Sequence, residues 1–143
     1  MSKLILHATS LTLRVGQTWR GVLIVGPSGI GKSDLALRAM QEGCLLVSDD
    51  YSCVWASGEK LYAAPPETID GKMEIRGLGI MDDTRRRPMT HVDLVALAQT
   101  DPVDRLPEAE ITPVLGLNIP TIRVNPREAS SLPKLLTRLR LGG

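Results

Sequence analysis

Residues 26–33 read Gly26-Pro27-Ser28-Gly29-Ile30-Gly31-Lys32-Ser33 and match the pattern G-x-x-x-x-G-K-[ST] at every defined position. In such a loop the glycines let the backbone wrap around phosphate groups with its N–H groups pointing inward. Lys32 can reach the β- and γ-phosphates of a nucleoside triphosphate, and the Ser33 hydroxyl can bind Mg²⁺. The alternative is a glycine-rich turn in which Lys-Ser follows by accident, and at average residue frequencies such a match has a probability of roughly 0.5% in this chain.

The residues on both sides of this loop have the patterns of a strand and a helix. Residues 21–25 (GVLIV) form a short apolar run that suits a buried parallel strand. Residues 33–41 are rich in Leu, Ala and Met without Gly or Pro, which predicts a helix, and Gly43 is a C′ stop. Residues 44–47 are again apolar and strand-like. We therefore expect an α/β fold, with flanking helices and a mixed β-sheet around the phosphate-binding loop 26–33, called the P-loop below.

The rest of the chain adds strands and one more helix. Leucines at helical spacing in residues 130–141 predict an amphipathic C-terminal helix. The acidic, proline-rich stretch 101–113 is interpreted as a connection. Apolar and β-branched runs predict the further strands 5–15, 51–56, 60–63, 91–98 and 119–124, and residues 73–80, with two glycines, are interpreted as a segment that passes from strand to loop.

Length and composition indicate one globular domain, residues 1–143. The net charge of +1 argues against a nucleic-acid partner held by bulk electrostatics. No apolar run is long enough to span a bilayer and the N-terminus lacks the apolar region of a signal peptide, so we expect a cytoplasmic protein with no membrane partner. Cys44 and Cys53 are expected to be buried thiols rather than a disulfide or a metal pair.

Two adjacent carboxylates, Asp49 and Asp50, end the strand that follows the P-loop helix. The carboxyl edge of parallel strands is where α/β proteins place their ligands. Here the pair could bind Mg²⁺, or one carboxylate could act as a general base toward a hydroxyl. A solvated turn that begins a loop is the other interpretation, and the residues alone leave both open.

Three segments together resemble the HPr kinase/phosphorylase family. They are GPSGIGKSDLALR (26–38), LVSDD (46–50) and EIRGLGI (74–80), and the resemblance covers roughly residues 5–125. Enzymes of that family phosphorylate a serine of the phosphocarrier protein HPr with ATP and Mg²⁺, and many also remove the phosphate by phosphorolysis. The resemblance implies a short, catalytic-domain-only form without the N-terminal domain of the longer members, HPr as the partner, and assembly into a hexamer.

The resemblance also implies roles for individual residues. Asp50 looks like the general base that accepts the proton of the target serine, with Asp49 beside it, and His7 like the histidine that tunes this base. Arg105 resembles an arginine that steadies the transferring phosphoryl group together with Lys32.

For the metal, Glu74 looks like a second Mg²⁺ ligand beside Ser33. The region 113–118 lacks arginines that the family uses for dephosphorylation, so the resemblance favours the kinase reaction.

The competing hypotheses are a P-loop small-molecule kinase and a nucleotide-sensing regulatory module. Arg85-Arg86-Arg87 could dock an acidic partner, or form a solvated basic loop.

Overall fold

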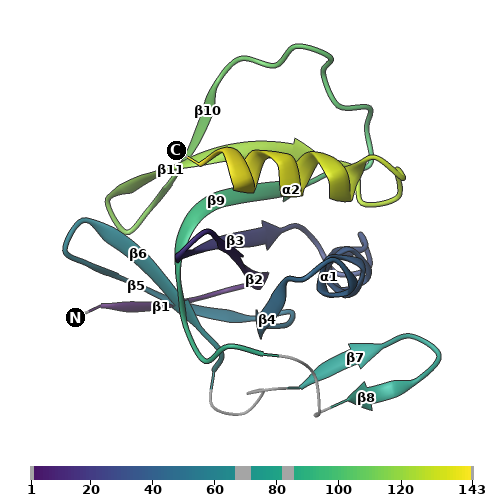
Figure 1. Ribbon diagram of the computed structural model, residues 1–143, viewed down its shortest axis with the longest axis horizontal. Coiled ribbons are helices and arrows are strands. Elements are labelled where there is room, and N and C mark those ends of the chain that lie inside the picture. The colour runs from purple at the N-terminus through teal and green to yellow at the C-terminus, as the bar shows by residue number, and fades with distance from the viewer. Residues whose placement is uncertain (1, 67–71, 82–85, 143) are drawn as a thin grey trace.

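The computed structural model describes residues 2–66, 72–81 and 86–142, drawn in colour in Figure 1. Its helices are α1 (Lys32–Gln41) and α2 (Ser131–Leu141). Its strands are β1 (Lys3–Leu6), β2 (Ala8–Val15), β3 (Thr18–Val25), β4 (Leu45–Ser48), β5 (Ser52–Ser57), β6 (Lys60–Ala64), β7 (Met73–Ile75), β8 (Gly79–Met81), β9 (Thr90–Ala98), β10 (Glu110–Val114) and β11 (Leu117–Val124).

Nine of these strands form one mixed sheet: seven follow the order β1-β5-β6-β9-β3-β2-β4, and β11 and β10 branch from β9. The long strand β9 has two partners along one side: its beginning pairs antiparallel with β6, and its end pairs parallel with β11, which carries β10 at its outer edge. Strands β7 and β8 pair only with each other and form a separate hairpin (Figure 1). The expected α/β class with a mixed sheet is confirmed.

The two helices share one apolar core. Leu35 and Ala39 of α1 and Leu135 of α2 are buried in a cluster with Leu11, Leu46 and other strand residues, so both helices cover the same face of the sheet. A second cluster contains only strand residues, among them Leu23, Val54, Leu61 and Val95. Neighbouring residues of a strand point to opposite faces, which is how strands such as β3 and β9 supply both clusters.

Strand β2 lies between β3 and β4 and runs antiparallel to both. Strands β3 and β4 are therefore parallel to each other, and β9 is parallel to β3. The carboxyl ends of β3, β4 and β9 meet at one edge of the sheet, and the amino end of β2 lies at the same edge. This edge is where the P-loop, the Asp49-Asp50 pair and the residue before β2 come together.

Several predicted elements have different bounds in the structure. The single strand expected over 5–15 is two strands, because the chain bends at His7: β1 pairs with β5, whereas β2 pairs with β3 and β4. The expected connection 101–113 ends in strand β10, which pairs with β11 despite Pro113 because it occupies a sheet edge. The segment 73–80 is the β7–β8 hairpin.

Other local expectations are confirmed or refined. Gly43 ends α1 with φ 105°, a left-handed conformation that favours glycine. Cys44 is buried and Cys53 half-buried, and both thiols are free. Arg87 is not a solvated side chain, because its guanidinium lies 4.3 Å over the Trp19 ring, whereas Arg85 lies outside the described residues. Neither α1 nor α2 has the length and hydrophobicity that a membrane-spanning helix needs.

Candidate functional site

The P-loop connects β3 to α1 and folds around its own lysine. The Nζ of Lys32 donates hydrogen bonds to the carbonyl oxygens of Gly26 at 2.6 Å and Pro27 at 3.0 Å. Gly29 and Gly31 have φ of 82° and 111°, so the turn needs glycine at both positions. Burial lowers the pKa of Lys32, and the negative charges of Asp50 and Asp49 oppose that shift. The ammonium is thus already inside the loop that would receive phosphates.

The buried carboxylate of Asp49 lies next to the hydroxyl of Ser33, in the first turn of α1. Ser33 Oγ donates to Asp49 Oδ1 at 2.7 Å, and Thr9 Oγ1 donates to the same oxygen at 3.2 Å. Asp49 is 6% exposed. Burial raises the pKa of its carboxyl, although the hydrogen bonds from Ser33 and Thr9 and one from the backbone of Glu74 partly offset that shift. Asp49 is therefore a desolvated carboxylate held by hydroxyl donors, with the Lys32 ammonium as a nearby positive charge.

This arrangement fits Mg²⁺. Ser33 Oγ and Asp49 Oδ1 are hard oxygen ligands close enough to bind one ion, and protein sites for Mg²⁺ commonly supply one or two such ligands and leave the others to phosphates and water. Among the described residues, no group of three or more His, Cys, Asp or Glu side chains could hold a metal ion without such help. Glu74 reaches Asp49 through its backbone, and its side chain is exposed.

The second carboxylate, that of Asp50, is much more exposed than that of Asp49. Asp50 Oδ1 is 2.8 Å from His7 Nε2, which is also 3.3 Å from the Ser28 hydroxyl in the P-loop. The Tyr51 ring stacks on the His7 ring with centroids 4.9 Å apart. The Asp50 side chain is 51% exposed, so an incoming hydroxyl group can reach it. Because an ionised carboxylate only accepts hydrogen bonds, the imidazole tautomer with a hydrogen on Nε2 is the one that donates to it in this contact.

Thr9 contacts the Asp49 carboxylate and the backbone of Asp50, and the sequence does not mark it as a candidate. Besides its bond to Asp49, its hydroxyl accepts a hydrogen bond from the backbone N–H of Asp50 at 3.1 Å. Asp50 has φ 67°, a left-handed conformation that is uncommon for residues other than glycine. In the sequence Thr9 is one β-branched residue of a strand, so no local signal distinguishes it from a packing residue.

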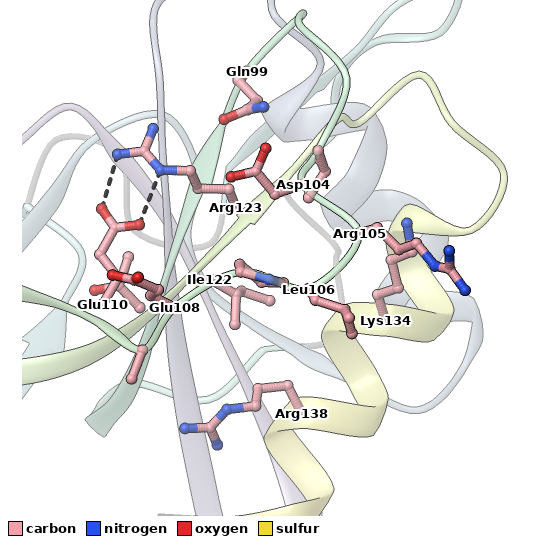
Figure 2. Close-up of a pocket in the computed structure, with 14 residues that line it drawn as sticks. Gln99, Asp104, Arg105, Leu106, Glu108, Glu110, Ile122, Arg123, Lys134 and Arg138 are labelled. Atoms are coloured by element: carbon pink, nitrogen blue, oxygen red, sulfur yellow. Dashed lines mark hydrogen bonds and ion pairs between the residues drawn. The ribbon is translucent and has the colours of Figure 1, made fainter.

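The structure brings together most of the predicted site residues, but not all. His7, Lys32, Ser33, Asp49 and Asp50 converge at the P-loop. Arg105 instead lines a cavity of about 1160 Å³ between the β9–β10 loop, β11 and α2, with Arg123 and Lys134 (Figure 2). No interaction recorded among the described residues joins Arg105 to the P-loop, and its role in phosphoryl transfer stays a prediction.

Comparison with known proteins identifies one family. Residues 13–138 match the family model described as HPr Serine kinase C-terminal domain. The HPr kinase/phosphorylase of Prosthecochloris aestuarii is 34% identical over 120 residues, which cover 74% of this chain and 35% of that protein. The HPr kinase/phosphorylase of Treponema pallidum (strain Nichols) is 34% identical over 131 residues, or 81% of this chain and 40% of the relative. The chain thus spans well under half of the length of these curated relatives.

A solved structure has the same fold. The Hpr(Ser) kinase/phosphatase from Coxiella burnetii superposes with a TM-score of 0.78 at 27% sequence identity, over 95% of this chain and 87% of that one. The likeness therefore extends over nearly the whole of this chain.

Proposed function

The chain belongs to the HPr serine kinase C-terminal domain family, and on that premise we propose that it transfers the γ-phosphoryl group of ATP to a serine of an HPr-type phosphocarrier protein. The observation that carries the proposal is the convergence of a P-loop lysine, a P-loop serine and two carboxylates, one buried and one open, at a single edge of the sheet. Phosphoryl transfer depends mostly on such positioning and on charge stabilisation.

The P-loop and Lys32 bind the phosphates in this proposal. The backbone N–H groups of the loop and of the first turn of α1 face the bound anion, and the helix contributes its positive end. Two of the three N–H donors of the Lys32 ammonium are engaged by Gly26 and Pro27, which leaves the third for a phosphate oxygen.

Ser33 and Asp49 would hold Mg²⁺, through the two oxygens that lie 2.7 Å apart. Bound there, the ion supplies neutralisation of the negative charge that accumulates on the phosphates. It would also compensate the cost of burying the Asp49 carboxylate. Glu74 of β7, whose backbone hydrogen-bonds Asp49, is proposed as a further ligand.

Asp50 is the general base. Its Oδ2 atom is the oxygen that His7 does not hold, and it takes the proton of the serine hydroxyl as that hydroxyl attacks. His7 keeps the carboxylate oriented through its Nε2–H, while Ser28 and the stacked Tyr51 ring limit how the imidazole can turn. The acceptor serine enters at the exposed Asp50 side chain, while Lys32 holds the phosphates within the P-loop.

The proposal is tested by incubating the protein with Mg²⁺, γ-labelled ATP and purified HPr, and locating the label by mass spectrometry. The control is an HPr variant in which the acceptor serine is alanine. Label on that serine alone would support the proposal. ATP binding without label on HPr would reject HPr as the acceptor and favour a nucleotide sensor, whereas label on a small molecule from a metabolite mixture would favour a small-molecule kinase.

A further inference from the structure

A cleft of about 410 Å³ lies beside the P-loop, whose own residues line part of it. Residues 27–30 of the P-loop form one wall, and residues 98–101 together with Arg127 form the rest. Neither His7 nor Asp50 lines it. Its volume is in the range of small-molecule sites, which typically measure about 300–1,000 Å³.

The direction of a bound triphosphate points its nucleoside end toward this cleft. The end that reacts must lie near Ser33 and Asp50, where the acceptor hydroxyl enters. The other end must therefore leave the P-loop elsewhere, and among the described residues the cleft over Gly29 and Ile30 is a cavity that opens directly on the loop.

The walls of the cleft are tied to each other by one side chain. Asn125 Nδ2 donates to the carbonyl oxygen of Thr100 at 3.2 Å, and Asn125 Oδ1 accepts from the backbone N–H of Arg127 at 3.1 Å. Gln99 adds side-chain hydrogen bonds to the carbonyl oxygens of Asp101 and Pro102, at 3.1 Å and 3.2 Å. The loop after β9 and the loop after β11 are thus held in fixed positions on either side of the opening.

Both walls also press closely on the P-loop. A Cβ atom added to Gly26 would lie 3.1 Å from Ala98 Cβ, and one added to Gly31 would lie 3.0 Å from Pro126 Cβ. Arg38 of α1 donates to the carbonyl oxygen of Pro126 at 2.5 Å, which fastens the second wall to the P-loop helix. The two loops that form the cleft are therefore packed directly against the P-loop and its helix.

Two charged side chains of opposite sign line the cleft, Asp101 and Arg127. No ion pair recorded in the part of the chain that the structure describes involves either of them. A carboxylate accepts hydrogen bonds from the two hydroxyls of a ribose, and a guanidinium stacks on the face of a nucleobase. A flat aromatic group bearing a sugar diol suits this pair.

We propose that this cleft binds the nucleoside of the triphosphate, with Asp101 accepting from the ribose hydroxyls and Arg127 stacking on the base. The inference rests on the proposed function, because it concerns the same bound nucleotide. It assigns recognition of the nucleoside to residues far from the P-loop in the sequence, because Asp101 lies 68 positions after Ser33.

The test compares ligands with and without the nucleoside. Calorimetry measures the Kd of Mg·ATP, Mg·2′-deoxyATP and Mg·tripolyphosphate for the wild type and for Asp101→Asn and Arg127→Lys. The lysine variant keeps the positive charge and removes the planar group. Asp104→Asn, in the larger cavity, serves as the matched control, and thermal denaturation verifies that each variant is folded.

We expect Asp101→Asn and Arg127→Lys each to weaken ATP binding by about tenfold and to leave tripolyphosphate binding unchanged. We also expect 2′-deoxyATP to bind the wild type more weakly than ATP does, and this difference to vanish in Asp101→Asn. Unchanged ATP affinity in both variants would overturn the inference and leave the proposed function standing. A wild type that binds neither ATP nor tripolyphosphate would overturn the proposed function, and this inference with it.

Discussion

The His7 imidazole lies 2.8 Å from the Asp50 carboxylate, although 43 positions separate the two residues in the sequence. His7 precedes β2 and Asp50 follows β4, and these two strands are neighbours in the sheet. The contact is thus a direct consequence of strand order. It holds one carboxylate oxygen while the Asp50 side chain stays 51% exposed, which is the arrangement that a general base for an incoming hydroxyl needs.

Replacing His7 by Phe should slow phosphoryl transfer without weakening nucleotide binding. The phenyl ring can still stack on Tyr51, but it removes the hydrogen bond that orients Asp50. Hydrogen bonds to charged groups contribute about 1.5–3 kcal/mol, so we expect kcat to fall roughly 10- to 100-fold. Steady-state kinetics together with the Kd of ATP would measure this. An unchanged kcat would show that His7 does not position the base.

The Thr9 hydroxyl should matter to both stability and catalysis. Thr9→Val keeps the shape of the side chain but leaves the Asp50 N–H without its acceptor and removes a donor from Asp49, and an unsatisfied buried group costs about 1–3 kcal/mol. Thr9→Ser keeps the hydroxyl and loses only a methyl group. Chemical denaturation and transfer rates should therefore show a large loss for valine and substantial recovery for serine. Equal losses in both variants would indicate packing rather than positioning.

Asp49→Asn should make the unliganded protein more stable at neutral pH. Burial raises the pKa of Asp49 above its ordinary value, so the folded state binds the proton more strongly than the unfolded state. The free energy of unfolding therefore falls as the pH rises from the unfolded pKa through the folded pKa, so at pH 7 the buried charge of Asp49 makes the wild type less stable than it is in acid. Asparagine carries no charge there and can still accept from Ser33 and Thr9.

Thermal denaturation of the two proteins measures this difference. We expect the Tm of Asp49→Asn to exceed that of the wild type at pH 7, and the gap to close in acid below the unfolded pKa. Mg·ATP should raise the Tm of the wild type much more than that of the variant. A variant that is less stable than the wild type at pH 7 without ligand would contradict the reasoning.

Two glycines of the P-loop offer a matched pair of substitutions. Gly31→Ala places a Cβ 3.0 Å from Pro126 at a residue with φ 111°, so it adds steric crowding to backbone strain. Gly29→Ala, with φ 82°, introduces strain in open space. Backbone strain of this kind costs about 1–3 kcal/mol, and crowding adds to it, so Gly31→Ala should lower the Tm more. The reverse order in thermal denaturation would mean that the P-loop and the β11–α2 loop are not in close contact.

Local patterns were sufficient for the parts of the fold that are local. The P-loop motif, the apolar run before it and the helical spacing after it predict the β3–α1–β4 unit, because each depends on neighbouring residues. The β9 and α2 segments carry clear apolar patterns and were predicted within one residue. The β10 strand was missed since its exposed edge position and Pro113 give it the composition of a connection.

The geometry of the site depends on contacts that no local pattern contains. The sequence indicates that Asp49 and Asp50 follow a strand, but only the insertion of β2 between β3 and β4 brings Thr9 and His7 to them. The cleft beside the P-loop is likewise built from two loops that follow different strands, so Arg127 and Asn125 have no signature in the sequence.

The proposed role of Asp50 can be tested by comparing Asp50→Asn with the wild type for both phosphate transfer to HPr and the Kd of Mg·ATP. Asp34→Asn on the exposed face of α1 is the matched control for the loss of one negative charge. A general base contributes typically about 100- to 10,000-fold, so we predict a fall of that size in transfer for Asp50→Asn, with ATP binding retained and the control unaffected. Transfer by Asp50→Asn at the wild-type rate would contradict the assignment of Asp50 as the base.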